Sequence, residues 1–295
     1  MKKRSTYNRD IQISNDTMYY IYDYIDTDIN IGDLAFKFGI DKTYFHKIFK
    51  EVMGSNIYET IKSIRLQKAS NLLLTNKLST ITEIASMCGY SSQTSFIRSF
   101  KERFNQTPKQ WKNGGYIEYS TNILKNSKLN LYDNSCFDKI EPKIVRTKGR
   151  KTYYIRYKGY IQRDELKKIW QKLYAWVYTN NVKNFEQIVV YHDNPIITPA
   201  EDCFYVAGII PEEKIGLSNT NLPCFYTPEA LYATFEFNGG FDDILRFTQW
   251  VYHNWLPRSG FETTTNPPYI TLNKNHFIEI DGKFDVLYYL PIQYI

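Results

Sequence analysis

Two short groups of polar side chains carry most of the hydrogen-bonding chemistry that stands out in this sequence. They take matching helical positions: Thr43, His46 and Lys47 in the first group, and Gln93, Thr94 and Arg98 in the second. Lys and Arg donate to guanine O6 and N7, Gln pairs with adenine N6 and N7, and Thr can offer its methyl group to thymine. Because residues three and four apart share one face of a helix, each group has the chemistry of a helix that reads base edges.

Further basic side chains lie beside these two groups. Lys42, Lys50 and Lys101 are expected to contact DNA phosphates and to set the register of the helices on a duplex. Two roles stay open for Arg65, a phosphate contact or a structural bridge between the two halves of the region. Any one of these residues would also fit a solvated surface, so the interpretation depends on two matched clusters.

The second group needs a helix-turn-helix to position it. Thr80, followed three residues later by Glu83, is typical of a capping box at the start of a helix. Gly89 supplies the positive φ that ends this helix, and Ser91 or Ser92 is expected to cap the next one. The pattern predicts two short helices joined by a tight turn, of which the second can enter the major groove.

Residues 31–50 repeat this unit. A small residue, the turn glycine and two buried aromatic positions correspond in pairs: Ala35 and Ala85, Gly39 and Gly89, Phe45 and Phe96, Phe49 and Phe100. Asn30 and Asp41 are the expected caps. An amphipathic helix over residues 57–75 joins the two copies and would be about 28 Å long. One turn of DNA measures about 34 Å, so the sequence predicts two reading heads on one chain.

These motifs resemble the DNA-binding domain of AraC/XylS-type transcription regulators over roughly residues 15–111. The resemblance is carried by FGIDKTYFHKIFK, IASMCGYSSQTSFIRSFKERFNQTP, the closing Trp111, and the spacing of Tyr58, Arg65, Ala69, Leu72 and Leu73. It implies an all-α domain of two helix-turn-helix units at residues 15–115. It also implies base contacts for the six residues of the two polar groups.

Composition and charge agree with this interpretation without deciding it. The 295 residues suffice for two domains, and 43% hydrophobic with 23% charged residues fit a globular protein. Residues 1–120 hold 17 Lys or Arg against 12 Asp or Glu, so the front of the chain carries most of the net +6. No apolar run approaches about 18 residues, the start lacks the apolar core of a secretory signal, and the cysteines form no CxxC pair. We therefore expect a cytoplasmic, nucleoid-associated protein.

The segments around the two reading units are expected to be simple. Residues 1–14 are predicted to form a basic tail, and an opening helix is predicted at about residues 16–26 with Ser14 or Asn15 as its cap. Thr107 and the proline after it start a last short helix that brings Trp111 onto the core, and glycines at 114–115 end it. Residues 116–139 show no helical period and are predicted to form a linker.

From about residue 140 the pattern changes to strands and two helices. Strand character marks KIVRTKGRKTYYIRYKG, EQIVVYHD, CFYVAGII, ALYATFEF and VLYYLPI, and helical character marks DELKKIWQKLYAWVYTN and residues 242–256. The order is β-β-α-β-β and then β-α-β-β, a rough duplication of a β-α-β-β unit. It predicts an α+β domain whose sheet carries both helices on one face.

A second resemblance covers residues 140–295. GRKTYYIRYKGYIQR, IVVYHDNPIITPAEDCFYVAGI, LYATFEFNGGFDDILRFTQWVYHNWLPRSG and the closing YYLPI are similar to the GyrI-like, or Rob-type, effector-binding domain. The resemblance implies a groove between the duplicated halves that holds an amphipathic or cationic organic ligand. A two-headed reader joined to this domain implies a regulator that senses small molecules.

The ligand-binding candidates are mostly aromatic: Tyr157, Trp176, Tyr191, Trp255 and Tyr288. Each would also fit a hydrophobic core. Members of the family often carry carboxylates where this chain has Ile270 and Leu287, and Glu236 is a possible substitute unless its strand turns it to solvent. Without those acids, we expect a neutral ligand or one bound by aromatic stacking.

Catalysis is not expected. The sequence contains no P-loop, dinucleotide fingerprint or HExxH, and its four histidines lack metal-ligand spacing, so neither an enzyme nor a cofactor is predicted. The alternative is a ligand-sequestering or hydrolytic groove in which DNA binding is secondary. The expected partners are double-stranded DNA, a small organic ligand and RNA polymerase, without a membrane. Because one chain carries both reading heads, a monomer is expected to be sufficient for binding a DNA site.

Overall fold

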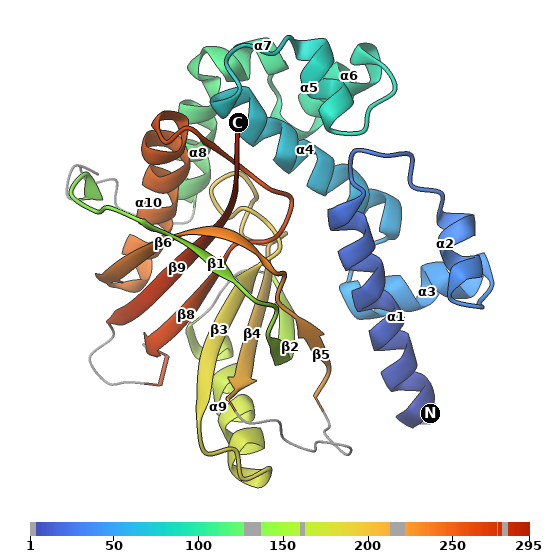
Figure 1. The fold of residues 1–295 in the computed structure, drawn as a ribbon, viewed down its shortest axis with the longest axis vertical. Coiled ribbons are helices and arrows are strands. Elements are labelled where there is room, and N and C mark those ends of the chain that lie inside the picture. Colours follow the sequence, from blue (N-terminus) through green and yellow to red (C-terminus); the bar gives the residue numbers. More distant parts are fainter. Residues whose placement is uncertain (1–3, 127–136, 160–162, 213–221, 276, 279–282) are drawn as a thin grey trace. The chain divides into compact units, whose positions relative to one another are not determined.

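The computed structural model describes residues 4–126, 137–159, 163–212, 222–275, 277–278 and 283–295 (Figure 1). It separates into two compact units, Met1–Asn113 and Gly114–Ile295. The first unit is helical and the second is built on an antiparallel sheet. The predicted fold class, an all-α helix-turn-helix domain followed by an α+β domain, is confirmed.

The helices of the first unit follow the predicted order (Figure 1). They are α1 Arg4–Asp23, α2 Ile31–Lys37, α3 Lys42–Met53, α4 Ile57–Thr75, α5 Ile81–Met87, α6 Gln93–Phe104 and α7 Pro108–Gln110. The connector α4 begins and ends at the predicted residues, so its 19 residues span about 28 Å.

Aromatic side chains form the core of the second half of this unit. Phe96, Phe100 and Phe104 line one face of α6 and are fully buried, as their helical spacing predicts. Trp111 packs on them, with ring centroids 5.6 Å from Phe100 and 4.7 Å from Phe104. Its indole Nε1 donates to the carbonyl of Ser70 at 3.2 Å, so the buried polar atom is satisfied and the ring is fixed onto α4. The predicted role of Trp111 is confirmed.

The opening helix is longer than predicted. Residues 4–14 were expected to belong to a basic tail, yet α1 begins at Arg4 and buries Ile11 and Ile13. Ser14, a predicted cap, instead lies inside the helix and donates to the carbonyl of Asp10 at 2.8 Å. The isoleucines continue the apolar face of α1 toward its N-terminus, and burying them favours helix over a solvated tail. Residues 1–3 of the predicted tail lie outside the described residues.

A second difference concerns the predicted linker at 116–139. The helix expected to stop at residues 113–115 passes through a π-turn over Trp111–Gly115 into α8, Tyr116–Asn126. Leu124 and Ser120 of α8 are fully buried, and Ser120 Oγ accepts a hydrogen bond from Gln249 at 2.9 Å. Tertiary packing therefore outweighs the helix-breaking tendency of two glycines. Residues 127–136 of the predicted linker lie outside the described residues.

The second unit contains helices α9 Arg163–Thr179 and α10 Phe241–Trp250, the latter continued by a π-turn, Val251–Trp255, and a 3-10 turn, Leu256–Arg258. Its described strands are β1 Lys143–Thr147, β2 Lys151–Lys158, β3 Phe185–Tyr191, β4 Phe204–Pro211, β5 Cys224–Tyr226, β6 Ala230–Gly239, β7 Phe261–Thr263, β8 Tyr269–Lys274 and β9 Phe284–Tyr294. They form one antiparallel sheet in the order β1-β6-β9-β8-β3-β4-β2-β5, with β7 beside β9.

The strand register shows that both helices cover the same face of this sheet. Tyr153 of β2 packs on Trp176 of α9, and Phe237 of β6 stacks on Phe247 of α10. A row of directly paired residues across β4, β3, β8 and β9 links Tyr153 to Phe237. Directly paired residues on neighbouring strands point to the same face of a sheet, so both contacts lie on one face. The prediction of two helices on one face is confirmed. We call this the helix-bearing face and the other the helix-free face.

The sheet is strongly curved because its distant strands are joined by a short connector. Six strand spacings separate β1 from β2 in the order, about 29 Å in a flat sheet. Only residues 148–150 join them, which reach about 14 Å when extended. The sheet must therefore curl (Figure 1). Its helix-free face lies on the inside, where Tyr154, Tyr232 and Tyr269 share a buried core with Ile188 and Val206.

Candidate nucleic-acid interface and ligand-binding face

The first helix-turn-helix is formed by α2 and α3. The Asn30 side chain accepts from the amide of Gly32 at 2.8 Å, and Asp41 accepts from that of Tyr44 at 2.8 Å, so each helix has the predicted cap. Gly39 adopts φ +65°, which ends α2 and starts the turn. The side chains of Phe45 and Phe49 on α3 point into the core of the unit and are fully buried.

The second helix-turn-helix is formed by α5 and α6. The Thr80 amide donates to Glu83 at 2.6 Å, and the Glu83 amide donates to Thr80 Oγ1 at 3.2 Å, so the predicted capping box is present. The Thr80 hydroxyl also donates to Glu83 Oε2 at 2.9 Å, and the bonds from the Thr80 amide and hydroxyl lower the pKa of the Glu83 carboxyl. Gly89 has φ +74°, and Ser92, not Ser91, caps α6 by accepting from the Ser95 amide.

The predicted DNA-contacting side chains are mainly exposed. The exposed base-contact candidates are Thr43 and Lys47 on α3 and Gln93, Thr94 and Arg98 on α6. The phosphate candidates Lys42, Lys50 and Lys101 are exposed as well. His46 differs, because it is half-buried with its ring 5.5 Å from that of Tyr58. A packed imidazole has less freedom to meet a base edge than the exposed side chains around it.

Arg65 forms a bridge within the first unit, which is one of the two roles left open for it. Its Nε donates to the carbonyl of Ile25 at 3.0 Å and its Nη2 to that of Thr27 at 2.7 Å. The guanidinium also lies over the ring of Tyr90, 5.9 Å from its centroid. Burial lowers the pKa of Arg65, and nearby Tyr90 and Asp28 oppose that change. The side chain thus connects the segment after α1 to the turn of the second helix-turn-helix.

Two polar contacts that position the reading helices were not predicted. Tyr44 of α3 donates its hydroxyl to buried Asp10 of α1 at 2.9 Å. Lys62 of α4 forms an ion pair with Glu102 of α6 at 2.8 Å. The partners are 34 and 40 residues apart, and no local spacing rule connects them. Each contact ties a reading helix to a neighbouring helix of the unit.

In the second unit, the aromatic ligand candidates share the helix-bearing face. The register places Tyr157, Tyr191 and Tyr288 on this face, and Trp176 and Trp255 lie against it with ring centroids 5.0 Å from Tyr153 and Phe235. Burial raises the pKa of the Tyr191 and Tyr288 hydroxyls, so both phenols stay neutral at physiological pH. These candidates present neutral phenol and indole groups.

Glu236 lies apart from these aromatic residues. It is exposed on the helix-free face, and its carboxylate pairs with Lys143 at 2.9 Å. The open possibility that its strand turns it to solvent is therefore the observed one, and the acid does not join the aromatic candidates. Ile270, where the family resemblance leads one to expect an acid, is buried on the helix-bearing face.

Two searches of the described residues gave negative results. None of the described helices is both long and apolar enough to cross a bilayer. Within the same residues, His, Cys, Asp and Glu side chains form no cluster of three or more suited to a metal ion.

Comparisons with known proteins agree with this division. The helix-turn-helix domain family matches residues 34–114, and the GyrI-like small molecule binding domain family matches residues 140–293. Because the second match covers more than half of the chain, the protein belongs to the GyrI-like family, with an AraC-type helix-turn-helix domain in front.

Several regulators are similar to this chain. The F1 operon positive regulatory protein of Yersinia pestis is 25% identical over 94% of this chain and 87% of its own length. The Transposon Tn10 TetD protein of Escherichia coli is 38% identical over 34% of this chain and 72% of its own. The xylose operon regulatory protein of Escherichia coli strain K12 is 36% identical, but the match spans 32% of this chain and 24% of that protein.

Among solved structures, the EcmrR C-terminal domain is similar with a TM-score of 0.44 and 13% identity, covering 53% of this chain and 99% of that one. The C-terminal domain of AraT from Geobacillus stearothermophilus gives a TM-score of 0.33 and 25% identity, covering 34% of this chain and 84% of that one.

Proposed function

We propose that the protein is a sequence-specific DNA-binding transcription regulator whose C-terminal domain senses a small organic ligand. The observation that carries the proposal is the pair of capped reading helices, α3 and α6, each with polar side chains exposed beside a buried aromatic face. Membership in a family of small-molecule-binding domains supports the sensing role.

In this proposal, α3 and α6 enter successive major grooves on one side of a duplex. Lys47 and Arg98 donate to guanine, Gln93 pairs with adenine, and Thr43 and Thr94 contact thymine methyl groups. Lys42, Lys50 and Lys101 bind phosphates and fix the register. His46 contributes less, because Tyr58 covers part of its ring. The helix α4, about 28 Å long, sets the separation of the two readers.

The remaining partners follow from this role. A regulator of this class acts in the cytoplasm beside the nucleoid and contacts RNA polymerase at the promoter, and two readers on one chain allow a monomer to occupy its site. The five aromatic candidates on the helix-bearing face bind the ligand by stacking and by hydrogen bonds from neutral phenols. A hydrolytic role is not favoured, because Glu236, the candidate base, lies on the opposite face in an exposed ion pair.

The test is binding to a DNA site selected from random sequences. Lys47→Ala and Arg98→Ala should each lose about 1–3 kcal/mol of discrimination between the selected site and a substituted one, because each removes a base contact. Fluorescence anisotropy on both duplexes at fixed salt measures this difference. Equal losses on selected and random DNA would overturn the base-reading role.

A further inference from the structure

Lys112 binds backbone oxygens at the entry to the second helix-turn-helix. Its Nζ donates to the carbonyls of Lys77 and Ser79 at 3.1 Å each and to that of Asn76 at 3.4 Å. An ammonium group carries three N–H donors, and these three carbonyls match that number. Because the acceptors are backbone oxygens, the contact holds the path of the chain itself.

The turn over residues 76–79 joins the end of α4 to the start of α5. Asn76 follows the last residue of α4, and its side chain accepts from the Ser79 amide at 3.1 Å. Thr80 then opens the capping box of α5. A cation near the C-terminal end of a helix also interacts favourably with the helix dipole. The turn is therefore held both by its own side chain and by Lys112.

This turn influences where α6 lies, because α5 and α6 are closely joined. The Gly89 amide donates to the carbonyl of Ser86 at 2.9 Å, and the Tyr90 amide donates to that of Ala85 at 3.0 Å. Ala85 is buried, as is Cys88 at the end of α5. A shift at the start of this seven-residue helix is therefore passed on to α6 through the tight turn.

Trp111, the neighbour of Lys112 in sequence, holds α6 directly. Its ring packs on Phe100 and Phe104, and its indole donates to the carbonyl of Ser70 on α4. Adjacent residues thus hold the two ends of the second helix-turn-helix, Lys112 at the entry to α5 and Trp111 at the buried face of α6. Together they fix α4, α5 and α6 relative to one another.

The first helix-turn-helix is entered through a segment held by a different cation. Arg65 of α4 donates to the carbonyls of Ile25 and Thr27, which precede α2. Arg65 also covers the ring of Tyr90 and so touches both repeats. The hydrogen bonds that Lys112 makes to described residues all go to the turn over residues 76–79. Lys112 therefore acts on the second repeat alone.

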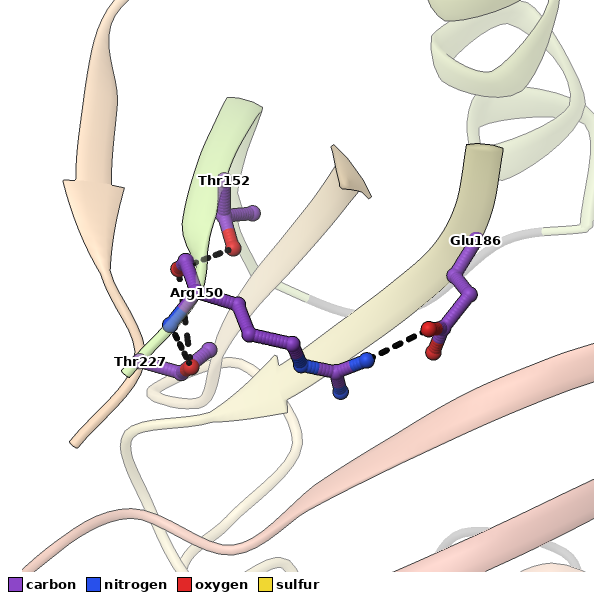
Figure 2. Close-up of polar contacts among 4 residues, drawn as sticks. All are labelled: Arg150, Thr152, Glu186 and Thr227. Atoms are coloured by element: carbon purple, nitrogen blue, oxygen red, sulfur yellow. Dashed lines mark hydrogen bonds and ion pairs between the residues drawn. The ribbon is translucent and has the colours of Figure 1, made fainter. Parts of the chain in front are cut away.

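Arg150 of the second unit provides a contrast (Figure 2). Its guanidinium pairs with the Glu186 carboxylate, and it exchanges two hydrogen bonds of 2.9 Å with Thr227 through its backbone. Arg150 precedes β2 and Glu186 lies in β3, and both strands pair with β4. The sheet already fixes the strands that this ion pair joins. Residues 76–79 belong to neither a helix nor a strand, so Lys112 supplies order that no ladder provides.

We propose that Lys112 is a positioning residue for the second reading helix. Its contacts with the turn over residues 76–79 keep Gln93, Thr94 and Arg98 at the correct distance from the base edges, and α3 does not depend on it. This inference rests on the proposed function, because it requires that α6 reads bases.

The accessibility of the turn separates positioning from folding. Lys77 is exposed, and Asn76 and Ser79 are half-buried, so water can replace the ammonium group at their carbonyls. Loss of Lys112 should therefore leave the unit folded while the turn becomes less well fixed. Recognition through Arg98 depends on that position, because its guanidinium must meet two acceptors of one guanine.

The experiment compares base discrimination by full-chain variants on the DNA site selected from random sequences. Loss of discrimination in Arg98→Ala identifies the base pair that α6 reads, and Lys47→Ala identifies the one that α3 reads. Fluorescence anisotropy then gives the ratio of affinities for the selected site and for a site substituted at each base pair. Lys112→Met should lower this ratio about threefold to tenfold at the α6 base pair and leave it unchanged at the α3 base pair.

Two further variants serve as controls. Lys112→Arg keeps the charge and the N–H donors and should restore both ratios to within about twofold of the unaltered protein. Lys109→Met removes the same charge from an exposed position on α7 and should leave both ratios unchanged. Equal losses at the two base pairs in Lys112→Met, or an equal effect of Lys109→Met, would overturn the proposal.

A double-mutant cycle tests whether Lys112 acts through Arg98. In an Arg98→Ala background, Lys112→Met should cause no further loss at the α6 base pair, whereas its effect should persist in a Lys47→Ala background. A further loss beside Arg98→Ala would contradict the proposal. If circular dichroism shows that Lys112→Met does not fold, Lys112→Gln, which loses the charge but keeps an amide donor, takes its place and should show the same pattern with a smaller loss.

This inference and the proposed function fail in different ways. If Arg98→Ala leaves discrimination unchanged, the base-reading function of α6 is wrong, and the role of Lys112 with it. If Arg98→Ala lowers discrimination and a folded Lys112→Met does not, the base-reading function stands and the positioning role of Lys112 is refuted.

Discussion

At the scale of single residues, Arg65 shows how one side chain can join two structural repeats. It satisfies the carbonyls of Ile25 and Thr27, which follow α1, and covers the ring of Tyr90, which follows the second turn. Hydrogen bonds to a charged group contribute about 1.5–3 kcal/mol each to stability, and partial exposure reduces this value.

Arg65→Met should therefore destabilise the first unit by about 1–3 kcal/mol, since two carbonyls lose their donor. Denaturant unfolding followed by far-ultraviolet circular dichroism measures the change. Lys68→Met, three residues later on α4, is the control and should stay within about 0.5 kcal/mol of the unaltered protein. A loss of stability of the same size in both variants would show that the Arg65 bridge contributes little to the stability of the unit.

His253 gives a residue-level prediction for pH. It is half-buried in the π-turn after α10, with its ring 4.8 Å from Tyr116 of α8, and desolvation lowers its pKa to about 4. In the unfolded chain a histidine titrates near 6.5, so between about pH 6.5 and 4 the unfolded state binds more protons. The stabilising effect of neutral His253 is complete above pH 6.5 and is lost as the pH falls toward 4.

The second unit should accordingly lose stability between pH 6.5 and 4. His253→Gln should reduce the slope of the unfolding free energy against pH by the amount that corresponds to about one bound proton. Thermal midpoints across this range, read from tryptophan fluorescence, provide the measurement. An unchanged slope in a folded His253→Gln protein would assign the acid sensitivity to other groups, such as His192, whose pKa burial lowers to about 3.

At the scale of elements, the two turn glycines offer a matched comparison. Both adopt positive φ, +65° at Gly39 and +74° at Gly89. A Cβ at Gly39 would meet nothing within 4 Å, whereas one at Gly89 would lie 2.5 Å from the Ile25 carbonyl oxygen and 2.8 Å from Arg65 Nη2. Both turns therefore need glycine for its left-handed backbone, and Gly89 needs it also because a Cβ there would clash.

Gly39→Ala should cost about 1–2 kcal/mol, the penalty of a left-handed residue with a Cβ. Gly89→Ala adds a backbone clash and should cost at least about 1 kcal/mol more, with loss of the Arg65 bridge. Parallel denaturant melts of the two variants test the difference. Equal costs would mean that the segment after α1 moves aside without penalty.

At the scale of the whole molecule, charge is divided between the domains. Residues 1–120 hold 17 basic against 12 acidic side chains, and the rest of the chain is nearly balanced. DNA affinity should therefore fall steeply with salt, through counterion release by the first unit.

Lys50→Gln should lower the slope of log affinity against log salt by about 1 while weakening cognate and random DNA alike, because it removes one phosphate contact. Lys172→Gln, an exposed lysine on α9 of the second unit, serves as the matched control and should leave the slope unchanged. Anisotropy titrations at several salt concentrations measure this slope for both variants. A slope that responds to Lys172 and not to Lys50 would move the DNA interface away from α3.

Local features of this protein were determined by the sequence itself. The caps at Asn30, Asp41 and Thr80, the left-handed Gly39 and Gly89, and the bounds of α4 follow from short-range rules, since each depends on residues within one or two helical turns. Strands β1 to β4, β6 and β9, and the face shared by both helices, also followed from alternation and order, whereas the short strands β5 and β7 did not. These features suffice to predict two reading helices and an α+β domain.

Only the tertiary structure decided which distant residues meet. It turned residues 116–126 of the predicted linker into α8, because Ser120 and Leu124 find a buried surface on a partner far along the chain. It assigned Arg65 to carbonyls 40 and 38 residues away, and it placed Glu236 and the aromatic candidates on opposite faces. It also set Arg150 beside Tyr269 by curling the sheet around a three-residue connector. Such contacts depend on register and curvature, which no local spacing in the sequence records.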